Sequence, residues 1–418
     1  MEYNFIEAIY ILMRKYKLIL ITLLIIVLFS CDKNEKLANE KPIQEKGVNF
    51  SVDNNYILKN NIPFKIKGVV YVPGYPGFLP WEIENSISLP IELKKSISSD
   101  ITEIKLMGAN TIRFWGAPKY CYEALKNIGD LNFIQVIWIK DDEPDFQNPL
   151  FKEDTKKYIR QVIDRIYTVF DDNSPPLVAL TIGNELSEKS ILSTNAAHPN
   201  INSFIGNHIT TESNITATEA FIAEMADYAS TYEFSTYGNK SLLTYSNEIR
   251  TEDIIDIPFL DFVSHNAYSY AVDYYRPETT PGSNSGTIFQ GWVEQIKSKH
   301  PYKPLLITET GLSVSPNARH VGPPNYGYGG NTEAEQATGL LQNINDINTS
   351  AFPLAGVCVH EFSDAWWKFG LEDSYSQDPN DVEEWFGVVK LKDSSDWYKT
   401  ELRGSYHALK EKWYLDNL

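Results

Sequence analysis

Eight short, almost continuously apolar runs recur along the chain, and the spacing between most of them leaves room for a helix. The runs are Phe64–Val72, Thr111–Trp115, Phe133–Ile139, Leu177–Asn184, Leu242–Asn247, Phe262–Tyr268, Pro304–Thr310 and Ala355–Phe362. Strands that are apolar on both faces are typical of a parallel sheet covered by helices. We therefore expect an α/β fold, a (β/α)8 TIM barrel in one domain over residues 51–418 with enlarged βα loops.

Amphipathic segments between the runs predict the helices. Residues 151–170 place apolar side chains at helical spacing. Thr332 and Glu335 form a capping-box pattern that opens a helix running to residue 347. Residues 289–299 and 400–414 also place apolar side chains at helical spacing and are predicted to be helices. The longest insertion, 186–216, is polar and follows the fourth run, at the end of the barrel where active sites form.

The first 31 residues have the layout of a bacterial lipoprotein signal peptide. Basic residues precede an apolar run that ends in Leu-Phe-Ser-Cys31, which resembles a lipobox. We expect Cys31 to be lipidated and Met13 to be the true start, with an N-terminal anchor helix as the alternative. Residues 32–50 are polar and charge-rich and are expected to form a flexible tether. The predicted location is the bacterial cell envelope, with membrane attachment through the N-terminal lipid only.

Composition excludes several classes of function. The chain of 418 residues carries 37 Lys and Arg against 55 Asp and Glu, a formal net charge of −18. So acidic a chain repels phosphate backbones, so nucleic acid is not an expected partner. Three cysteines are too few for a disulfide framework, and Cys358 is expected to be packed rather than reactive. Phosphate-binding, dinucleotide and serine-hydrolase motifs are missing from the sequence, and the seven histidines are scattered, so we expect no cofactor and no metal.

Charged and aromatic residues stand where the expected strands end. They are Arg113 and Trp115 at the second run, Asn184 and Glu185 at the fourth, His265, Asn266 and Tyr268 at the sixth, Glu309 at the seventh, and Trp366 and Trp367 after the eighth. Cleaving a glycosidic bond requires one carboxylic acid to protonate the leaving oxygen and a second carboxylate to meet the oxocarbenium-like centre. Glu185 and Glu309 come three strands apart, which puts them across the barrel mouth and predicts this pair.

The motifs around these glutamates resemble those of the retaining glycoside hydrolases of clan A. Gly183-Asn184-Glu185 and Thr308-Glu309-Thr310-Gly311 carry the resemblance, together with residues 64–77, 100–116, 360–368 and 383–389. The set looks most like the TIM-barrel catalytic domains of families two and five, and it also resembles β-1,3-glucanosyltransferases.

The resemblance implies a role for each side chain of the expected site. Glu185 corresponds to the acid/base, Asn184 to the residue that binds the sugar 2-hydroxyl, Glu309 to the nucleophile, Arg113 and Tyr268 to its cationic and phenolic neighbours, and Trp366 to the platform under the sugar. Arg113 and Tyr268 should keep Glu309 ionised, whereas a drier site and the nearby negative charge should raise the pKa of Glu185. Of His265 and Asn266, which alternate along a strand, we expect Asn266 to bind substrate.

Three alternatives remain open within the site. Glu248, at the end of the fifth run, is the rival of Glu185, and Glu361 on the eighth is the rival of Glu309. Trp367 is the rival platform to Trp366, because neighbours on an extended chain face opposite ways. His360-Glu361 begins like a zinc-protease motif, but the second histidine is missing and the pair lies on an expected strand.

The predicted activity is retaining hydrolysis of a β-glycoside, most simply a β-glucan polysaccharide or oligosaccharide, by double displacement. A transglycosylase using the same two glutamates is one alternative, and a non-catalytic glycan-binding lipoprotein is the other. A retaining pair should place its carboxyl groups about 5–5.5 Å apart. The Gly-, Pro- and Tyr-rich stretch 313–331 is expected to line the substrate site.

Overall fold

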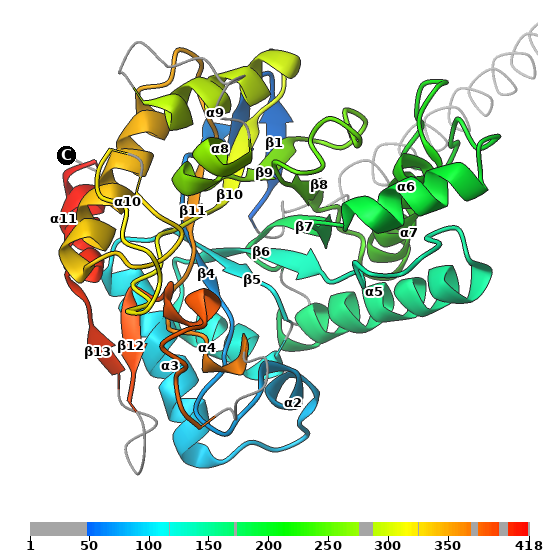
Figure 1. Cartoon of the computed structure of the whole chain (residues 1–418). Coiled ribbons are helices and arrows are strands. Elements are labelled where there is room, and N and C mark those ends of the chain that lie inside the picture. Colours follow the sequence, from blue (N-terminus) through cyan, green and yellow to red (C-terminus); the bar gives the residue numbers. More distant parts are fainter. Residues whose placement is uncertain are drawn as a thin grey trace, which may run out of the picture. The chain divides into compact units, whose positions relative to one another are not determined.

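The eight apolar runs form a closed barrel of parallel strands (Figure 1). The strands are β4 (Ile66–Tyr71), β5 (Thr111–Phe114), β6 (Asn132–Ile137), β7 (Leu177–Asn184), β8 (Leu242–Asn247), β9 (Val263–Asn266), β10 (Leu305–Thr310) and β11 (Gly356–Val359). They follow one another around the barrel in chain order, and β11 closes it against β4. The expected (β/α)8 barrel is confirmed. Seven of the predicted runs contain a whole barrel strand, and β6 begins one residue before its run.

The computed structural model describes residues 48–116, 118–170, 174–275, 287–324, 326–368, 375–392 and 400–416. All of them belong to the unit Val48–Leu418. The expected signal peptide, its Cys31, and the tether as far as residue 47 lie outside the described residues. Within the described part, none of the helices is both long enough and apolar enough to span a membrane.

Helices follow most of the barrel strands. They are α2 (Pro80–Asn85), α3 (Ile91–Leu106), α4 (Lys119–Ile128), α5 (Pro149–Phe170), α6 (Glu188–Ala197), α7 (Ala217–Tyr237), α8 (Ser269–Tyr275), α9 (Ile288–Lys299), α10 (Glu333–Asn348) and α11 (Gly404–Leu415), with short 3-10 helices η1 (Trp366–Lys368) and η2 (Val382–Trp385). The predicted capping box is confirmed, because Thr332 and Glu335 cap α10 reciprocally. The prediction of a helix from residue 400 was wrong at its start, where β13 (Thr400–Leu402) pairs with β12 (Val389–Leu391). The polar insertion 186–216 contains α6, while residues 248–262, between β8 and β9, carry no helix.

A small antiparallel sheet that the sequence analysis did not predict precedes the barrel. It consists of β1 (Phe50–Asp53), β2 (Tyr56–Lys59) and β3 (Ile62–Pro63). Phe50 and Ile57 pack in one apolar cluster with Ile66, Leu242 and Ala355, which lie at or next to the amino-terminal ends of barrel strands. The sheet therefore covers the end of the barrel opposite the strand carboxyl ends. The prediction that the tether extends through residue 50 was wrong at its end, because Phe50 is already part of β1.

Inside the barrel, Cys358 on β11 lies opposite Gly68 on β4. A Cβ atom added to Gly68 would come 2.5 Å from the Cys358 sulfur, so glycine is required there to make room for the thiol. Cys358 has no exposed surface, and burial raises the pKa of its thiol to about 12. The expectation that Cys358 is packed rather than reactive is confirmed.

One buried ion pair ties the C-terminal helix to the barrel. Arg403, the residue before α11, donates from Nη1 and Nη2 to the two carboxylate oxygens of Asp364, over 2.6 and 2.8 Å. Arg403 also donates to the carbonyl oxygen of Gly387, and both side chains of the pair are at most 1% exposed. Because neither charge reaches water, the loss of hydration of each must be offset by its attraction to the other.

Replacing Asp364 with Ala should therefore lower the free energy of unfolding by about 3–5 kcal/mol, since it leaves the Arg403 charge buried without its carboxylate. Urea denaturation followed by circular dichroism measures this difference. The matched control is Glu92→Ala, which removes the exposed pair between Glu92 and Lys95 and should cost less than about 1 kcal/mol. A cost for Asp364→Ala no larger than that of the control would contradict the assignment.

Candidate active site

Glu185 and Glu309 line one cavity of about 770 Å³ at the carboxyl ends of the barrel strands. Glu185 directly follows β7, where the backbone turns through positive φ angles at Gly183 (86°) and at Glu185 itself (47°). Glu309 lies on β10, at a register shift between β10 and β9. The backbone turn at the end of β7 thus carries Glu185, and the register shift near the end of β10 carries Glu309. Sequence reasoning thus predicted that these residues share a site, and the structure brings them together.

Glu309 is held by a cation and a phenol. Arg113 on β5 donates from Nη1 to Glu309 Oε1 over 2.5 Å, and the Tyr268 hydroxyl donates to Oε2 over 2.7 Å. Arg113 has no exposed surface and Glu309 is 3% exposed. Hydrogen bonds from charged and polar donors favour the ionised form of a carboxyl group. Both predicted neighbours of Glu309 are therefore in the predicted positions.

Glu185 has the opposite surroundings. Removal from bulk water raises its pKa to about 8, and the negative charges of Glu309 and Glu248 add to this effect. Asn266 opposes it, because its Nδ2 donates to Glu185 Oε1 over 2.8 Å. At neutral pH Glu185 is therefore mainly protonated beside an ionised partner. A protonated acid and a carboxylate facing one cavity can together protonate a leaving group and attack a carbon centre.

The asparagines of the predicted site form a connected network. Asn184 accepts from Arg113 Nη2 over 2.7 Å and from Asn266 Nδ2 over 3.1 Å. Asn266 also accepts from the Thr308 hydroxyl over 2.8 Å and lines the cavity, whereas Asn184 is not among the lining residues. His265 points away from the site and contacts the ring of Trp292 on α9. The predicted alternation is confirmed, with Asn266 rather than His265 at the cavity.

Neither tryptophan of the predicted platform lines the cavity. Trp366 is 4% exposed and packs in the hydrophobic core, and Trp367 lies edge-on to Trp115 at 6.3 Å between ring centroids. The aromatic residue that does line the cavity from this side is Trp115, whose ring stacks on His360 at 5.4 Å. Sequence reasoning singled out Trp115 but did not give it this place. The platform prediction for Trp366 is therefore not supported by its position.

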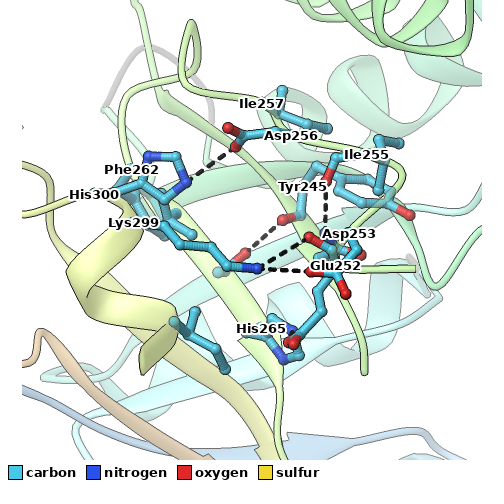
Figure 2. Close-up of a pocket in the computed structure, with 14 residues that line it drawn as sticks. Tyr245, Glu252, Asp253, Ile255, Asp256, Ile257, Phe262, His265, Lys299 and His300 are labelled. Atoms are coloured by element: carbon cyan, nitrogen blue, oxygen red, sulfur yellow. Dashed lines mark hydrogen bonds and ion pairs between the residues drawn. The ribbon is translucent and has the colours of Figure 1, made fainter. Parts of the chain in front are cut away.

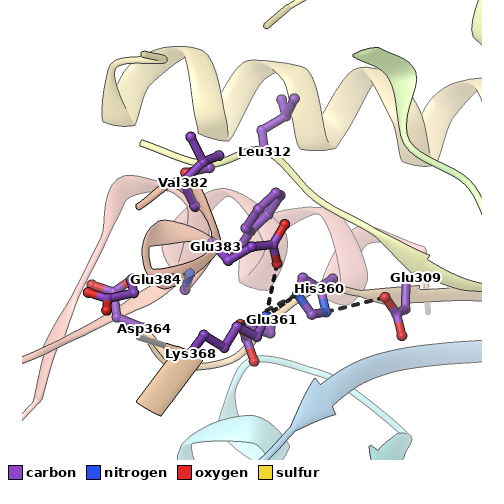
Figure 3. Close-up of polar contacts among 12 residues, drawn as sticks. Glu309, Leu312, His360, Glu361, Asp364, Lys368, Val382, Glu383 and Glu384 are labelled. Atoms are coloured by element: carbon purple, nitrogen blue, oxygen red, sulfur yellow. Dashed lines mark hydrogen bonds and ion pairs between the residues drawn. The ribbon is translucent and has the colours of Figure 1, made fainter. Parts of the chain in front are cut away.

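The two rival glutamates have cations of their own. Glu248 reaches the cavity wall and accepts from Arg250 Nε over 2.6 and 2.8 Å. Glu361 is 2% exposed and accepts from Lys368 over 3.1 Å (Figure 3). Sequence reasoning missed Lys368 as a residue of the site. The incomplete zinc-protease pattern pointed at its neighbour His360, but, among the described residues, no cluster of three or more metal-ligating side chains is arranged to hold an ion.

The loop after β10 supplies one wall of the cavity, as predicted for the stretch 313–331. Its lining residues are Arg319, Val321, Tyr326, Gly327 and Tyr328. Tyr328 packs against Tyr270, which follows β9, with ring centroids 4.9 Å apart. The other predicted loop, 186–216, contributes no lining residue to this cavity.

A second, smaller cavity of about 260 Å³ lies between the β8–β9 region and α9 (Figure 2). Its polar side chains pair with one another, His300 with Asp256 over 3.0 Å and Lys299 with Asp253 over 3.0 Å. His265 lines it with Nε2 3.0 Å from Glu252. Because the predicted pair Glu185 and Glu309 lines the larger cavity and not this one, the larger cavity is the candidate active site.

Comparison with known proteins identifies the fold but not a family. No family model matches the chain, and no curated protein matches it. Among solved structures, the chain is similar to the GH2 β-galacturonidase of Eisenbergiella tayi bound to galacturonate, with 18% identity and a TM-score of 0.58, over 88% of this chain and 54% of that one. It is also similar to the β-glucuronidase of Ruminococcus gnavus, with 16% identity and a TM-score of 0.57, over 88% and 53%. The chain thus spans about half the length of these structures, which share its eight-stranded barrel.

The charge of Glu309 should control the titration of Glu185. Replacing Glu309 with Gln removes a neighbouring negative charge, so the pKa of Glu185 should fall below its value of about 8. Carbon-13 NMR of the glutamate carboxyl groups, assigned with Glu185→Gln, measures the shift. Glu92→Gln, on the exposed face of α3, is the control and should leave the Glu185 titration in place. An unchanged titration in Glu309→Gln would show that the two carboxyl groups are not coupled.

The raised pKa of Glu185 also determines how its contribution to the free energy of unfolding changes with pH. The folded chain holds the Glu185 proton up to about pH 8, whereas an unfolded glutamate releases it near pH 4.3. Between these values the folded state binds more protons, so the contribution of Glu185 to stability falls as pH rises. The free energy of unfolding of Glu185→Gln should lack this decline, which urea denaturation between pH 5 and pH 8 detects.

Proposed function

We propose that the chain is a retaining β-glycoside hydrolase acting by double displacement. The observation that carries the proposal is that two carboxyl groups at one cavity have environments that favour opposite protonation states. Glu309 is bound by Arg113 and Tyr268, whereas Glu185 has a raised pKa and faces an asparagine amide. Retaining glycosidases require one ionised and one protonated carboxyl group.

In the first step, the carboxylate of Glu309 attacks the anomeric carbon while Glu185 gives its proton to the departing oxygen. The glycosidic bond breaks, and an ester bond forms between the sugar and Glu309. In the second step, Glu185, now ionised, takes a proton from water, and that water attacks the same carbon. The ester bond breaks, and Glu309 recovers its negative charge next to Arg113, which stabilises it as a leaving group.

Transglycosylation is the alternative outcome of the second step, when a sugar hydroxyl replaces water. The cavity contributes tyrosine rings from two loops, Tyr268 and Tyr270 on one side and Tyr326 and Tyr328 on the other. Such rings can stack on an acceptor sugar as well as on a substrate. A non-catalytic glycan-binding role is disfavoured, because binding alone does not require a protonated glutamate beside an ionised one.

For the sugar, we propose a β-linked glucan, on the resemblance to glucanosyltransferases. A specific observation favours β-uronides as the second candidate. Arg319 lines the cavity as an exposed side chain, and in the described part of the chain it forms no hydrogen bond or ion pair with another residue. Its guanidinium can bind a sugar carboxylate, and the similar structures include a galacturonidase and a glucuronidase. A panel of defined glucan and uronide oligosaccharides with product analysis separates the two.

The catalytic proposal predicts that mutants of the two glutamates differ in whether a covalent intermediate forms and in the configuration of the product with azide. Glu309→Ala should form no covalent intermediate, and azide attacking from the vacated side should give a product of inverted configuration. Glu185→Ala should lower kcat/KM about 10²–10⁴-fold on substrates with poor leaving groups. It should still be glycosylated by activated aryl glycosides, and azide should restore its turnover with retained configuration. Proton NMR of the first-formed product reads the configuration.

Glu188→Ala, in the exposed first turn of α6, is the matched control and should keep wild-type activity. An inverted product from the wild-type protein, or a distance between the two carboxyl groups above about 7 Å, would contradict a retaining pair.

We also propose that the protein is anchored to the bacterial envelope by lipid on Cys31. The support is the lipobox-like sequence at residues 28–31, which follows a basic and apolar segment. Metabolic labelling with a palmitate analogue should label the wild-type chain, and Cys31→Ala should lose the label and leave the membrane fraction. Cys121→Ala, which alters a buried cysteine, is the control and should keep the label. Persistent labelling of Cys31→Ala would show that the lipid is elsewhere.

A further inference from the structure

His360 is a buried histidine that faces the candidate nucleophile. It directly follows β11, is 2% exposed and lines the cavity. Its Nδ1 lies 3.6 Å from Glu309 Oε2 and has no hydrogen-bond partner in the described part of the chain. Buried polar atoms without a partner are rare in folded proteins. This nitrogen is therefore a feature that packing alone does not explain.

The other ring nitrogen of His360 is bound by an ammonium group. Lys368, in η1, lies with Nζ 3.1 Å from His360 Nε2, 3.1 Å from Glu361 Oε1 and 3.3 Å from Glu383 Oε2 (Figure 3). An ammonium group has three hydrogens and no lone pair, so it can only donate. His360 Nε2 must therefore accept, and in the neutral ring the proton is on Nδ1.

His360 is neutral in this environment. Burial and the positive charges of Lys368 and Arg113 lower the pKa of its imidazole well below the usual value. Burial also opposes the charge of Lys368, but the carboxylates of Glu361 and Glu383 outweigh it and raise the pKa of the ammonium. A charged lysine beside a neutral histidine is thus the stable arrangement.

The ring of His360 is held in place on three sides. Trp115 stacks on it at 5.4 Å between ring centroids, Phe386 meets it edge-on at 5.3 Å, and Tyr268 does so at 6.0 Å. The imidazole therefore cannot turn Nδ1 away from Glu309 without displacing these rings. Its direction is set by packing, and the protonation of its two nitrogens is set by Lys368.

We propose that Lys368 is a positioning residue of the active site, which fixes the tautomer of His360 so that the imidazole presents an N–H group, and not a lone pair, to the carboxylate of Glu309. The proposal rests on the proposed function for the role of Glu309 as nucleophile. The N–H dipole adds a third source of stabilisation for the Glu309 anion, after Arg113 and Tyr268. A neutral donor does this without supplying a proton that would quench the nucleophile, as an imidazolium would.

Without Lys368 the opposite tautomer becomes available. Glu361 Oε1 lies 3.4 Å from His360 Nε2 and could then accept a hydrogen bond from an N–H group at that nitrogen. Nδ1 would turn a lone pair toward the Glu309 carboxylate, and the two would repel each other. Burial raises the pKa of Glu361 to about 7, so Glu361 is itself a titrating neighbour. The remaining charged groups that face this cluster are Glu383 from η2 and Arg113 from β5.

NMR of the histidine ring nitrogens tests the tautomer directly. The chain has seven histidines, and the signal of His360 is assigned by its loss in His360→Phe. The wild-type protein should show Nδ1 protonated and Nε2 unprotonated from pH 5 to pH 8. Lys368→Arg should keep this pattern, since arginine also only donates, whereas Lys368→Met should shift it to protonated Nε2. A wild-type ring protonated on Nε2, or an unchanged pattern in Lys368→Met, overturns the proposal.

Titration of Glu309 tests the consequence. In both Lys368→Met and His360→Phe, the midpoint for the Glu309 carboxyl carbon should rise, and the acid limb of kcat/KM should move to higher pH with it. His360→Phe keeps the lysine charge, so an unchanged midpoint in that variant would show that only the charge matters and would overturn the role of the N–H group. Lys67→Met, which removes a half-buried ammonium near the amino-terminal end of β4, is the control and should change neither quantity.

These outcomes separate the inference from the proposed function. If no form of the protein cleaves any glycoside, the proposed function fails, while the NMR tautomer and the Glu309 titration still decide the inference. If Lys368→Met does not fold, the wild-type tautomer and the His360→Phe titration decide it. Activity with the opposite tautomer would support the function and overturn the inference.

Discussion

The guanidinium of Arg113 connects strands from separate parts of the barrel mouth. From β5 it donates to Glu309 on β10, to Asn184 on β7 and to Ser246 on β8. Because Arg113 has no exposed surface, its charge depends on the carboxylate of Glu309 for compensation. The folded barrel and the ionised state of Glu309 are thus stabilised by the same interaction. A carboxyl group that the fold itself requires to be charged is well suited to act as a nucleophile.

The second glutamate depends on the first. Among the described residues, the Glu185 side chain receives only an amide hydrogen bond from Asn266. Burial and the charge of Glu309 raise its pKa. Arg113 also reaches this side of the site, because Asn184 accepts from both Arg113 and Asn266. Asn184 therefore links Asn266, which contacts Glu185, to the ion pair of Arg113 and Glu309. The two carboxyl groups form one coupled electrostatic unit.

The sequence allowed prediction of those site residues whose positions follow from where the strands end and from the order of the strands around the barrel. Glu185, Glu309, Arg113 and Asn266 stand at strand ends, and barrel topology brings such ends together. Trp366 could not be placed in this way. The prediction assumed an extended chain beyond the eighth strand, but η1 begins at Trp366 and directs its ring into the core.

Other features of the site arise from contacts that no local pattern encodes. Lys368 reaches His360 because a turn of η1 brings it back over the end of β11, and the sequence shows no periodicity that predicts such a return. The sheet β1–β3 was missed for a related reason. Its strands are two to four residues long, and polar residues of the turns surround them, so no run is long enough to show the alternation of a strand.

The distribution of cations among the carboxyl groups distinguishes Glu185, the proposed acid, from its neighbours. Among the described residues, five glutamates lie in or next to the cavity, namely Glu185, Glu248, Glu309, Glu361 and Glu383. Arg113 binds Glu309, Arg250 binds Glu248, and Lys368 binds both Glu361 and Glu383. In the described part of the chain, Glu185 alone of the five has no ion pair. A buried carboxyl group without a cation keeps its proton more readily than a paired one, so the placement of three basic residues on other strands and loops favours Glu185 as the proposed acid.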